Sequence, residues 1–399
     1  MLTHALILII LAACFIYSLF SAAIGRTILT LPILFVAFGY AISEPLNAGV
    51  DSALLYEGRR LLAEITLILV LFSDASHVRF QRIRENWQIP VRMLVIAMPL
   101  TILFGAAVAL WLNPTSGFAM ALLTAALLTP TDAALGQPVV SNPAVPSRLS
   151  QSINVESGLN DGFVLPFVLL GAIFASAGMG HAETDGLALS VLLQLVLGPV
   201  AGIAVGSGAA RMMDWAQSRK LTAESAAGVV FLTSAFAAYI LSVAVGGNGF
   251  IAAFVAGMVF GNTYRHDIRF ISEFMEGVGQ ILTMAAFLVF GAFLLPDGFA
   301  HVTQNAVILA ILFLTIVRML PVFLSLAGTG LPVREKLFLG WFGPRGLASI
   351  LFTLIMMDEF ELPNEPELLA CVSMTVAMSV VLHGISATPL ASRIGRVES

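Results

Sequence analysis

The sequence predicts an all-α membrane protein that crosses the bilayer about thirteen times. Of its 399 residues, 58% are hydrophobic and only 11% are charged, whereas a soluble domain carries about 25% charged residues. The mean hydropathy is +0.95, and the apolar residues fall into runs close to the roughly 20 residues that a membrane helix needs. This composition excludes a soluble enzyme, a nucleic-acid-binding protein and a disordered chain.

Short polar segments divide the chain into thirteen apolar runs. The first run lacks a positively charged start and a small-residue cleavage site, so we interpret it as a retained helix rather than a signal peptide. The second and ninth runs are short, which favours tilted or partly re-entrant segments. The predicted spans are 4–24, 28–43, 60–74, 89–111, 117–135, 150–177, 187–213, 222–245, 249–262, 270–295, 302–325, 335–357 and 367–391.

The 19 Lys and Arg residues orient the chain, because positive charge concentrates in the cytoplasmic loops of membrane proteins. Only Arg59 and Arg60 fall in the opposite loops, which also carry the acidic stretch from Asp358 to Glu367. We therefore expect a multi-pass protein of the inner (plasma) membrane, with the N-terminus outside and a short cytoplasmic tail at 392–399. The cytoplasmic set comprises Arg26, Arg79, Arg82, Arg84, Arg92, Arg148, Arg211, Arg219, Lys220, Arg265, Arg269, Arg334, Lys336, Arg393 and Arg396.

Among the charged residues within the apolar runs, six are singled out as candidates for a buried site. A charge at the centre of a bilayer costs about 2.5–3.5 kcal/mol on insertion scales, and such residues usually line a pathway or pair with one another. Structural ion pairs alone would leave at least two of the acids without a cationic partner, and burial disfavours an unpaired carboxylate in its charged form. The six are Glu64, Asp132, Glu156, Asp161, Arg318 and Arg345.

Two of the runs are interrupted by Pro and Gly. The fifth reads Leu-Leu-Thr-Pro-Thr-Asp-Ala over 127–133, and the twelfth reads Gly-Trp-Phe-Gly-Pro-Arg-Gly over 340–346. Thirteen spans divide as six, a linker and six, which makes these runs counterparts in an inverted repeat, the sequence signature of a transporter site. Half-helix termini attract acids at N-terminal ends and bases at C-terminal ends, and Asp132 and Arg345 lie at the two breaks. Ordinary proline kinks are the alternative.

The sixth run carries the densest polar motif, Asn-Val-Glu-Ser-Gly-Leu-Asn-Asp-Gly over 154–162. Residues four apart share a helix face, whereas residues five apart diverge by about 140°. Ser157 and Asp161 therefore point one way and offer hard oxygen ligands for a small cation. Glu156 and Asn160 point another way, towards a structural face, where Arg318 of the eleventh run is the best partner for the glutamate.

These motifs together resemble the NhaP-type sodium/proton antiporters of the monovalent cation:proton antiporter superfamily. The resemblance implies an NhaA-like fold in a single transmembrane unit over 1–391, with dimerisation helices, a mobile six-helix core that includes 117–177 and 302–391, and two broken helices that cross. It also implies a homodimer. The segments that carry it are Thr129-Pro130-Thr131-Asp132, Glu156 to Asp161, Gly246-Gly247-Asn248-Gly249-Phe250 with Gly261-Asn262, and Gly343-Pro344-Arg345-Gly346.

The resemblance further implies that Na⁺ and H⁺ compete for Asp161, with Asp132, Ser157 and Thr131 completing the cation site. Glu64 matches a third-helix acid that helps to hold the cation in some relatives. The family pairs the acid matching Glu156 with the arginine matching Arg318, and it has asparagine before the key aspartate in electroneutral members, so Asn160 predicts one-for-one exchange. For Arg345 we expect dipole compensation or gating.

Three alternatives to a Na⁺(Li⁺)/H⁺ antiporter stay open from the sequence. A K⁺/H⁺ antiporter is the nearest, because cavity size and ligand flexibility decide ion preference. The second is an intramembrane enzyme, although the sequence contains no His-Glu-x-x-His zinc motif and we interpret His383 as a packing residue. A gated channel is the third. We expect a secondary transporter without cofactor, whose partners are a monovalent cation, the proton and the lipid bilayer, and not nucleic acid.

Overall fold

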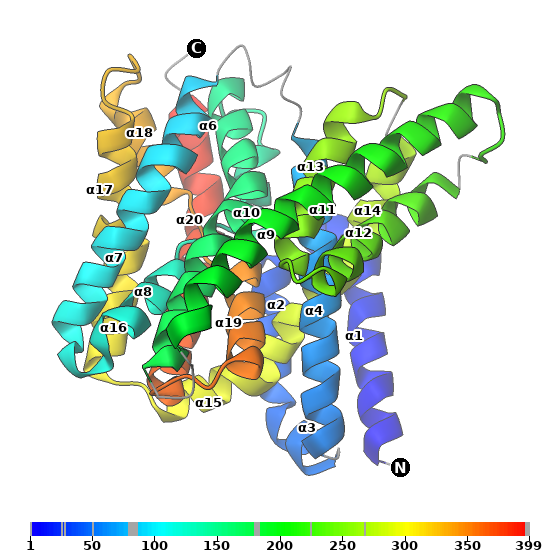
Figure 1. Cartoon of the computed structure of the whole chain (residues 1–399). Coiled ribbons are helices and arrows are strands. Elements are labelled where there is room, and N and C mark those ends of the chain that lie inside the picture. The colour runs from blue at the N-terminus through cyan, green and yellow to red at the C-terminus, as the bar shows by residue number, and fades with distance from the viewer. Residues whose placement is uncertain are drawn as a thin grey trace.

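The computed structural model describes residues 2–24, 27, 29–49, 52–78, 87–178, 184–223, 226–266 and 269–395. Within these ranges every regular element is helical (Figure 1). In chain order the elements are α1 (Leu2–Ile24), α2 (Leu31–Ala41), α3 (Ser43–Gly49), α4 (Ser52–His77), α6 (Gln88–Arg92), η1 (Met93–Ala97), α7 (Met98–Leu112), η2 (Pro114–Ser116), α8 (Gly117–Leu127), α9 (Ala133–Val140), α10 (Ser147–Ala177), α11 (Thr184–Ser218), α12 (Ala226–Ala244), α13 (Gly249–Thr263), α14 (Arg269–Val289), η3 (Phe290–Leu294), α15 (Leu295–Ala300), α16 (Gln304–Leu314), α17 (Ile316–Ser325), α18 (Val333–Trp341), α19 (Leu347–Glu359) and α20 (Glu365–Gly395).

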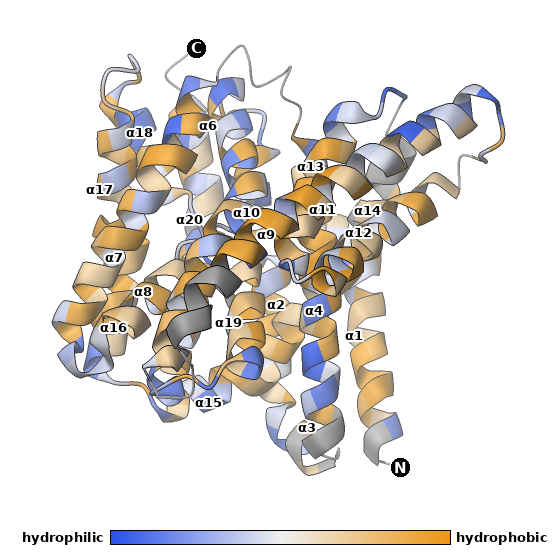
Figure 2. Cartoon of the chain, viewed as in Figure 1, coloured by the Kyte–Doolittle hydropathy of each residue, from blue (hydrophilic) through white to orange (hydrophobic). Residues whose placement is uncertain are grey.

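Eight helices within the described ranges are long and apolar enough to cross a membrane. Large apolar side chains cover their outer surfaces; Leu8 and Phe15 of α1, for example, are each 68% exposed. Apolar residues dominate the middle of the bundle, and polar residues gather towards its two ends (Figure 2). The chain is therefore a polytopic membrane protein. The eight helices are His4–Ile24, Gln88–Leu112, Ser147–Ala177, Leu192–Ser218, Ala226–Ala244, Gly277–Ala300, Gln304–Ser325 and Glu365–Ile394.

The third predicted run needs a correction in its bounds. The prediction placed it at 60–74, whereas α4 runs from Ser52 to His77. The three residues that follow Asp74 are still helical. Asp74 therefore lies inside the helix rather than at its end, and the buried Ser76 beside it also faces the protein interior.

One end of the bundle gathers basic side chains. Arg148, at the start of α10, donates from Nη2 to Glu335 Oε1 of α18 at 2.8 Å. Arg92 of α6 donates from Nη1 to the carbonyl of Ala327 at 2.6 Å. We call this the basic end; α6, α18 and the last turns of α20 lie there, at the top of Figure 1.

The opposite end gathers the acidic loop between α19 and α20. Arg60 Nε of α4 lies 2.9 Å from Asp358 Oδ2, and Ser116 Oγ donates to Glu367 Oε2 at 3.0 Å. We call this the acidic end; α15 and the start of α1 lie there, at the bottom of Figure 1. The two chain termini thus lie at opposite ends of the bundle.

Glycines set the close packing of α11 on α13. A Cβ atom added at Gly202 would lie 2.6 Å from the carbonyl oxygen of Ala252, and one added at Gly206 would lie 2.4 Å from that of Ala256. Only helices without side chains at these positions can approach so closely, as small-residue helix pairs do in membranes. The spacing of four residues keeps both glycines on one face of α11.

A second glycine pair sets α13 against α4. A Cβ atom at Gly257 would meet the carbonyl oxygen of Phe72, and one at Gly261 would meet that of Ser76, each at 2.1 Å. The contact fixes the last turns of α4. Asp74 lies between these two carbonyl positions in the sequence, so the packing determines where its side chain is held.

The Gly-Gly-Asn-Gly-Phe motif begins α13. Gly246 has a φ of +82°, a backbone conformation that glycine adopts without strain. Asn248 follows as the N-cap, and its Oδ1 accepts hydrogen bonds from the backbone N–H groups of Phe250 and Ile251, each at 3.0 Å. The motif thus turns the chain and caps the helix that packs on α4.

Candidate functional site

The two predicted interruptions are real breaks, and they touch each other. Helical structure stops between α8 and α9 at 128–132 and between α18 and α19 at 342–346. The backbone N–H of Asp132 in the first break donates to the carbonyl of Pro344 in the second at 2.7 Å. Neither Pro130 nor Pro344 has a backbone N–H to continue a helix, so each break leaves polar backbone groups that need partners within the membrane.

Asp132 satisfies the N-terminal ends of both half-helices. Its Oδ1 accepts from the N–H groups of Ala134 and Leu135 at the start of α9, at 2.7 and 3.3 Å. Its Oδ2 accepts from the N–H of Leu347 at the start of α19, at 2.7 Å. One buried carboxylate therefore caps two helices, where the positive ends of both helix dipoles converge.

Arg345 supplies the opposite charge at the C-terminal end of α8. The side chain is fully buried, and its Nη1 donates to the carbonyls of Thr129 and Pro130, the latter at 3.1 Å. These carbonyls lack helical partners because α8 ends just before them. The guanidinium group thus places a positive charge beside these free carbonyls.

The backbone around Arg345 is tied to α20. Ser379 Oγ accepts from the N–H of Arg345 at 2.6 Å and lies 3.2 Å from His383 Nδ1. His383 Nε2 lies 2.9 Å from the carbonyl of Trp341, the last residue of α18. His383 is thus a buried histidine with both ring nitrogens bonded, and it braces the second break.

The glycines of the second break make room for charged side chains. A Cβ atom at Gly343 would lie 2.5 Å from Arg318 Nε, and one at Gly346 would lie 2.0 Å from Asp132 Oδ2. The Gly-Pro-Arg-Gly motif therefore leaves space for one guanidinium and one carboxylate that arrive from other helices.

Glu156 and Arg318 form a fully buried ion pair between α10 and α17. Arg318 Nη1 and Nη2 donate to Glu156 Oε1 and Oε2 at 2.5 and 2.8 Å. Both side chains are 2% exposed. The two-point geometry compensates much of the cost of taking both charges out of water.

Ser157 and Asn160 both hold the first break through Thr131. Ser157 Oγ donates to the carbonyl of Thr131, and Asn160 Nδ2 donates to Thr131 Oγ1, each at 2.8 Å. The N–H of Thr131 donates back to Asn160 Oδ1 at 3.3 Å. The prediction that Asn160 belongs with Glu156 on a separate face was wrong on this point, because residues three apart on a helix are also neighbours.

Asp161 lies in the wall of a cavity of about 180 Å³ between α4, α10, α14 and the two breaks. Its side chain is buried, and its Oδ1 has no hydrogen-bond partner among the residues that the structure describes. The cavity extends to His77, which is exposed at the basic end. Asp132 and Asp74 share the lining, and none of its described residues is Lys or Arg. Three carboxylates around a small space attract cations.

Asp74 is a site residue that the sequence reasoning missed. A Cβ atom at Gly158 would lie 3.4 Å from the carbonyl oxygen of Asp74, so α4 and α10 approach closely here and bring Asp74 into the same cavity as Asp161. The helical continuation of α4 to His77 is the signal that could have identified it, because it places an acid one turn inside an apolar helix.

Glu64, the third-helix acid of the prediction, is not brought to this cavity. It lies ten residues before Asp74 on α4, about 15 Å along the helix axis, and its side chain bonds to Tyr239. Ser157 and Thr131 bond to each other and are not among the residues that line the cavity. Of the residues predicted to hold the cation, Asp132 and Asp161 face the cavity.

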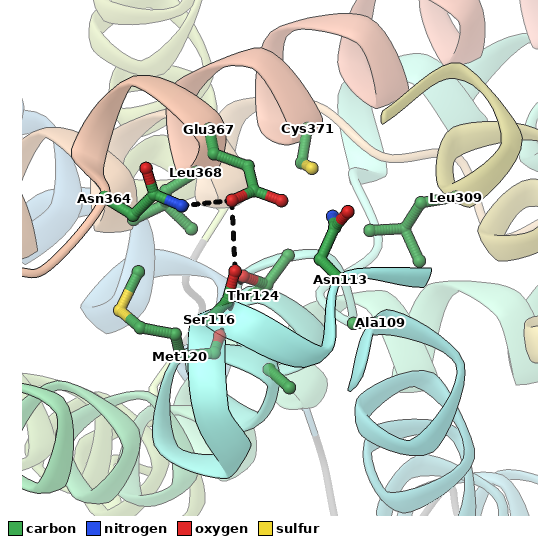
Figure 3. A pocket seen from close by; sticks show the side chains of 11 residues that line it. Ala109, Asn113, Ser116, Met120, Thr124, Leu309, Asn364, Glu367, Leu368 and Cys371 are labelled. Carbon is green, nitrogen blue, oxygen red and sulfur yellow. Dashed lines mark hydrogen bonds between the residues drawn. The ribbon is translucent and has the colours of Figure 1, made fainter. Parts of the chain in front are cut away.

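A second, much smaller cavity of about 20 Å³ lies at the acidic end (Figure 3). The carboxylate of Glu367 lies between the hydroxyl of Ser116 and the amide of Asn364, and bonds to both. Thr124 of α8 and Cys371 of α20 line its inner part. The side chains of α8 between Thr124 and the first break are fully buried, so packed residues separate the two cavities.

Comparison with known proteins identifies the family of this chain. The family described as "Sodium/hydrogen exchanger, transmembrane" matches residues 6–393. The chain belongs to this family. It is 25% identical over 336 residues to the K(+)/H(+) antiporter NhaP of Alkalimonas amylolytica, covering 83% of this chain and 57% of the relative. It is 24% identical over 380 residues to the Na(+)/H(+) antiporter 2 of Zygosaccharomyces rouxii, covering 86% and 46%.

The fold of this sodium/hydrogen exchanger family member is that of a solved antiporter. The structure of the sodium proton antiporter MjNhaP1 from Methanocaldococcus jannaschii at pH 8 matches with a TM-score of 0.80, covering 99% of each chain at 18% identity. The chain spans less than two thirds of the length of the curated relatives described above. The family and the fold are therefore established.

Proposed function

We propose that this protein is a secondary antiporter that exchanges a monovalent cation, Na⁺ or Li⁺, for H⁺. One observation carries the proposal: Asp161, in the wall of a cavity lined by acids, has a buried carboxylate oxygen for which the described part of the chain offers no hydrogen-bond partner. Such an oxygen can bind a proton or a desolvated cation, but not both at once. Competition at one carboxylate then couples the two fluxes without any cofactor.

The neighbours of Asp161 supply the remaining oxygen ligands. Asp74 shares the cavity and offers a second carboxylate. Ser157, one turn before Asp161 on α10, and its partner Thr131, next to Asp132, offer hydroxyl and carbonyl oxygens. These are the hard ligands that alkali cations prefer. Asp132 contributes its negative charge while its oxygens hold the two half-helices together.

Alternating access completes the proposed cycle. The cavity at Asp161 extends towards the basic end, and packed residues of α8 close the route to the acidic end. We assign the structure to the half of the cycle in which the ion site faces the cytoplasm. The basic end is then cytoplasmic. In this proposal the chain crosses the membrane thirteen times, has an inverted repeat around the two breaks, and forms a homodimer whose six-helix core moves.

The proposed exchange is electroneutral. Asn160 carries no charge and is occupied in holding Thr131, which leaves Asp161 as the carboxylate that changes its occupant. Asp74 is the observation that favours an electrogenic exchange instead, because a second titrating acid in the cavity would allow two protons per cation. Transport by proteoliposomes under a clamped membrane potential separates these cases: a rate that follows the voltage in the parent but not in Asp74→Asn assigns the second proton to Asp74.

The test of antiport is dissipation of a pH gradient in everted vesicles after addition of Na⁺, Li⁺ or K⁺ in turn. We expect Na⁺ and Li⁺ to dissipate the gradient. Dissipation by K⁺ alone would instead identify a K⁺/H⁺ antiporter, the activity in the name of the Alkalimonas relative. Asp161→Asn should abolish the response and Glu57→Gln, a change of an exposed acid, should keep it. Cation-driven proton flux in folded Asp161→Asn would refute the proposed role of Asp161.

A further inference from the structure

A third cavity, which shares no lining residue with the cavity at Asp161, lies at the basic end where α11 and α13 finish. Its volume is about 900 Å³, five times that of the cavity at Asp161. Polar and charged side chains line it, including Arg211 and Trp215 from α11 and Arg265 and His266 from the segment after α13. Cation transport as proposed above does not use these residues.

The cavity carries unneutralised positive charge. Its acid, Asp214, is already engaged, because Asp214 Oδ1 lies 2.8 Å from His266 Nδ1 and accepts from the N–H of Arg265 at 3.1 Å. The guanidinium groups of Arg211 and Arg265 have no carboxylate partner among the residues that the structure describes, and both side chains are exposed. Two arginines from different segments thus line one polar space, in which the described residues supply a single carboxylate, that of Asp214.

The position of this cavity is that of a membrane surface. At 35 residues, α11 is about 52 Å long, which exceeds the roughly 30 Å thickness of the hydrocarbon core. Val200 and Ile203 on its outer face are more than half exposed, and so are Met212 and Trp215 beside the cavity. Tryptophan is enriched at the membrane–water interface. The far end of α11 becomes hydrophilic just beyond this apolar stretch (Figure 2).

We infer that this cavity binds the headgroup of an anionic phospholipid, with Arg211 and Arg265 on the phosphate and the acyl chains along Met212 and Trp215. Basic pockets between membrane helices on the cytoplasmic side are suited to such headgroups, and the guanidinium fork matches phosphate oxygens. A free phosphate offers the same charge, but the exposed apolar face that leads to the cavity favours a ligand with chains. A lipid bound here ties α11 to the end of α13.

The experiment compares lipids on the purified full-length protein in a non-ionic detergent. Binding of dioleoyl-phosphatidylglycerol and dioleoyl-phosphatidylcholine is measured by native mass spectrometry, and the unfolding midpoint is measured with each lipid and with 10 mM inorganic phosphate. We expect phosphatidylglycerol to bind more tightly and to raise the midpoint. In Arg211→Gln/Arg265→Gln its affinity should fall about 30-fold, since each arginine near an anionic surface contributes roughly a factor of five.

The matched control is Arg334→Gln/Arg393→Gln, which removes two exposed arginines outside the cavity and should leave the affinity within about twofold. Equal affinity for the two lipids, or equal losses in both double variants, would overturn the inference. Inorganic phosphate that raises the midpoint as far as phosphatidylglycerol does would overturn the assignment to a lipid. If the cavity double variant does not fold, either single variant should still lose about fivefold, and an unchanged affinity in both would refute the inference.

Discussion

Two buried aspartates at the crossing of the breaks have opposite surroundings, and this contrast separates their roles. Asp132 accepts three backbone hydrogen bonds, so its charge is committed to the fold. Asp161 has an oxygen without a partner among the described residues, which is why we propose it as the binding group for the mobile ion. Residue type alone does not distinguish them, because both are acids within apolar runs.

Removing one partner of the buried ion pair should destabilise the protein strongly. Arg318→Ala leaves Glu156 buried without its cation, which costs about 3–5 kcal/mol. Thermal unfolding in detergent measures this loss. The control is Arg60→Ala, whose ion pair with Asp358 has an arginine that is 58% exposed and should contribute only about 0–1 kcal/mol. Equal unfolding midpoints for the two variants would contradict the proposed contribution of the buried ion pair to stability.

Gly346→Ala should disturb the crossing through Asp132. The new methyl group would lie 2.0 Å from Asp132 Oδ2, so the carboxylate must leave the N–H of Leu347, and a lost cap costs about 1–2 kcal/mol. We expect a lower unfolding midpoint and slower exchange in vesicles. Gly136→Ala on α9 is the control, because its added methyl group meets only Ile153 Cγ2 at 4.0 Å; unaltered exchange in Gly346→Ala would argue against this geometry.

At the scale of elements, the broken helices have a different role from the glycine faces, which are Gly202 and Gly206 on α11 and Gly257 and Gly261 on α13. The breaks place backbone termini inside the membrane, where Asp132 and Arg345 provide partners of the matching sign. The glycine faces of α11 and α13 let whole helices approach, and this approach holds the last turns of α4 and hence Asp74. The site thus depends on elements that carry no ligand themselves.

One helix offers a matched test of the glycine face. Gly206→Ala would place a methyl group 2.4 Å from the carbonyl oxygen of Ala256 and should cost about 1–3 kcal/mol through overpacking. Gly208→Ala, two residues along α11, meets no atom within 4 Å and should be neutral or stabilise by up to about 1 kcal/mol. Unfolding midpoints of the two variants check the prediction; the same shift in both would mean that helix propensity, not packing, decides.

At the scale of the whole molecule, the two ends of the bundle are not equivalent. A cavity of about 180 Å³ extends from Asp161 towards the basic end, whereas the acidic end has a pocket of about 20 Å³ that stops at packed side chains of α8. The asymmetry is what a transporter in one state of an alternating cycle would have.

Cys371 can report the opposite state. It lines the pocket at the acidic end and is 2% exposed, so a small thiol reagent should modify it slowly in the state described. In a Cys14→Ser background we expect transported cation to accelerate this modification roughly tenfold, as when a state populated at a few per cent becomes a major one. The rate is followed by mass spectrometry. Equal rates with Na⁺ and with choline would contradict the proposed opening.

Much of the site could be predicted from the sequence because buried charge is rare in a membrane. Asp132, Glu156, Asp161 and Arg318 stand out against apolar surroundings, and the helical repeat indicates which of them share a face. Asp74 did not stand out, because Ser73 and His77 beside it resemble a helix boundary. Glu64 did stand out, but it bonds to Tyr239 away from the cavity.

The sequence by itself determined the helical membrane class, the two breaks and the short set of buried charges, since these follow from local composition and from the cost of charge in a bilayer. Only the tertiary structure decided which charges meet. Asp132 spans two half-helices that lie 215 residues apart in the chain, Arg318 reaches Glu156 across 162 residues, and Asp161 Oδ1 has no partner within the described ranges. Partners at such separation are selected by helix packing, in which glycine contacts fix distances that no local pattern encodes.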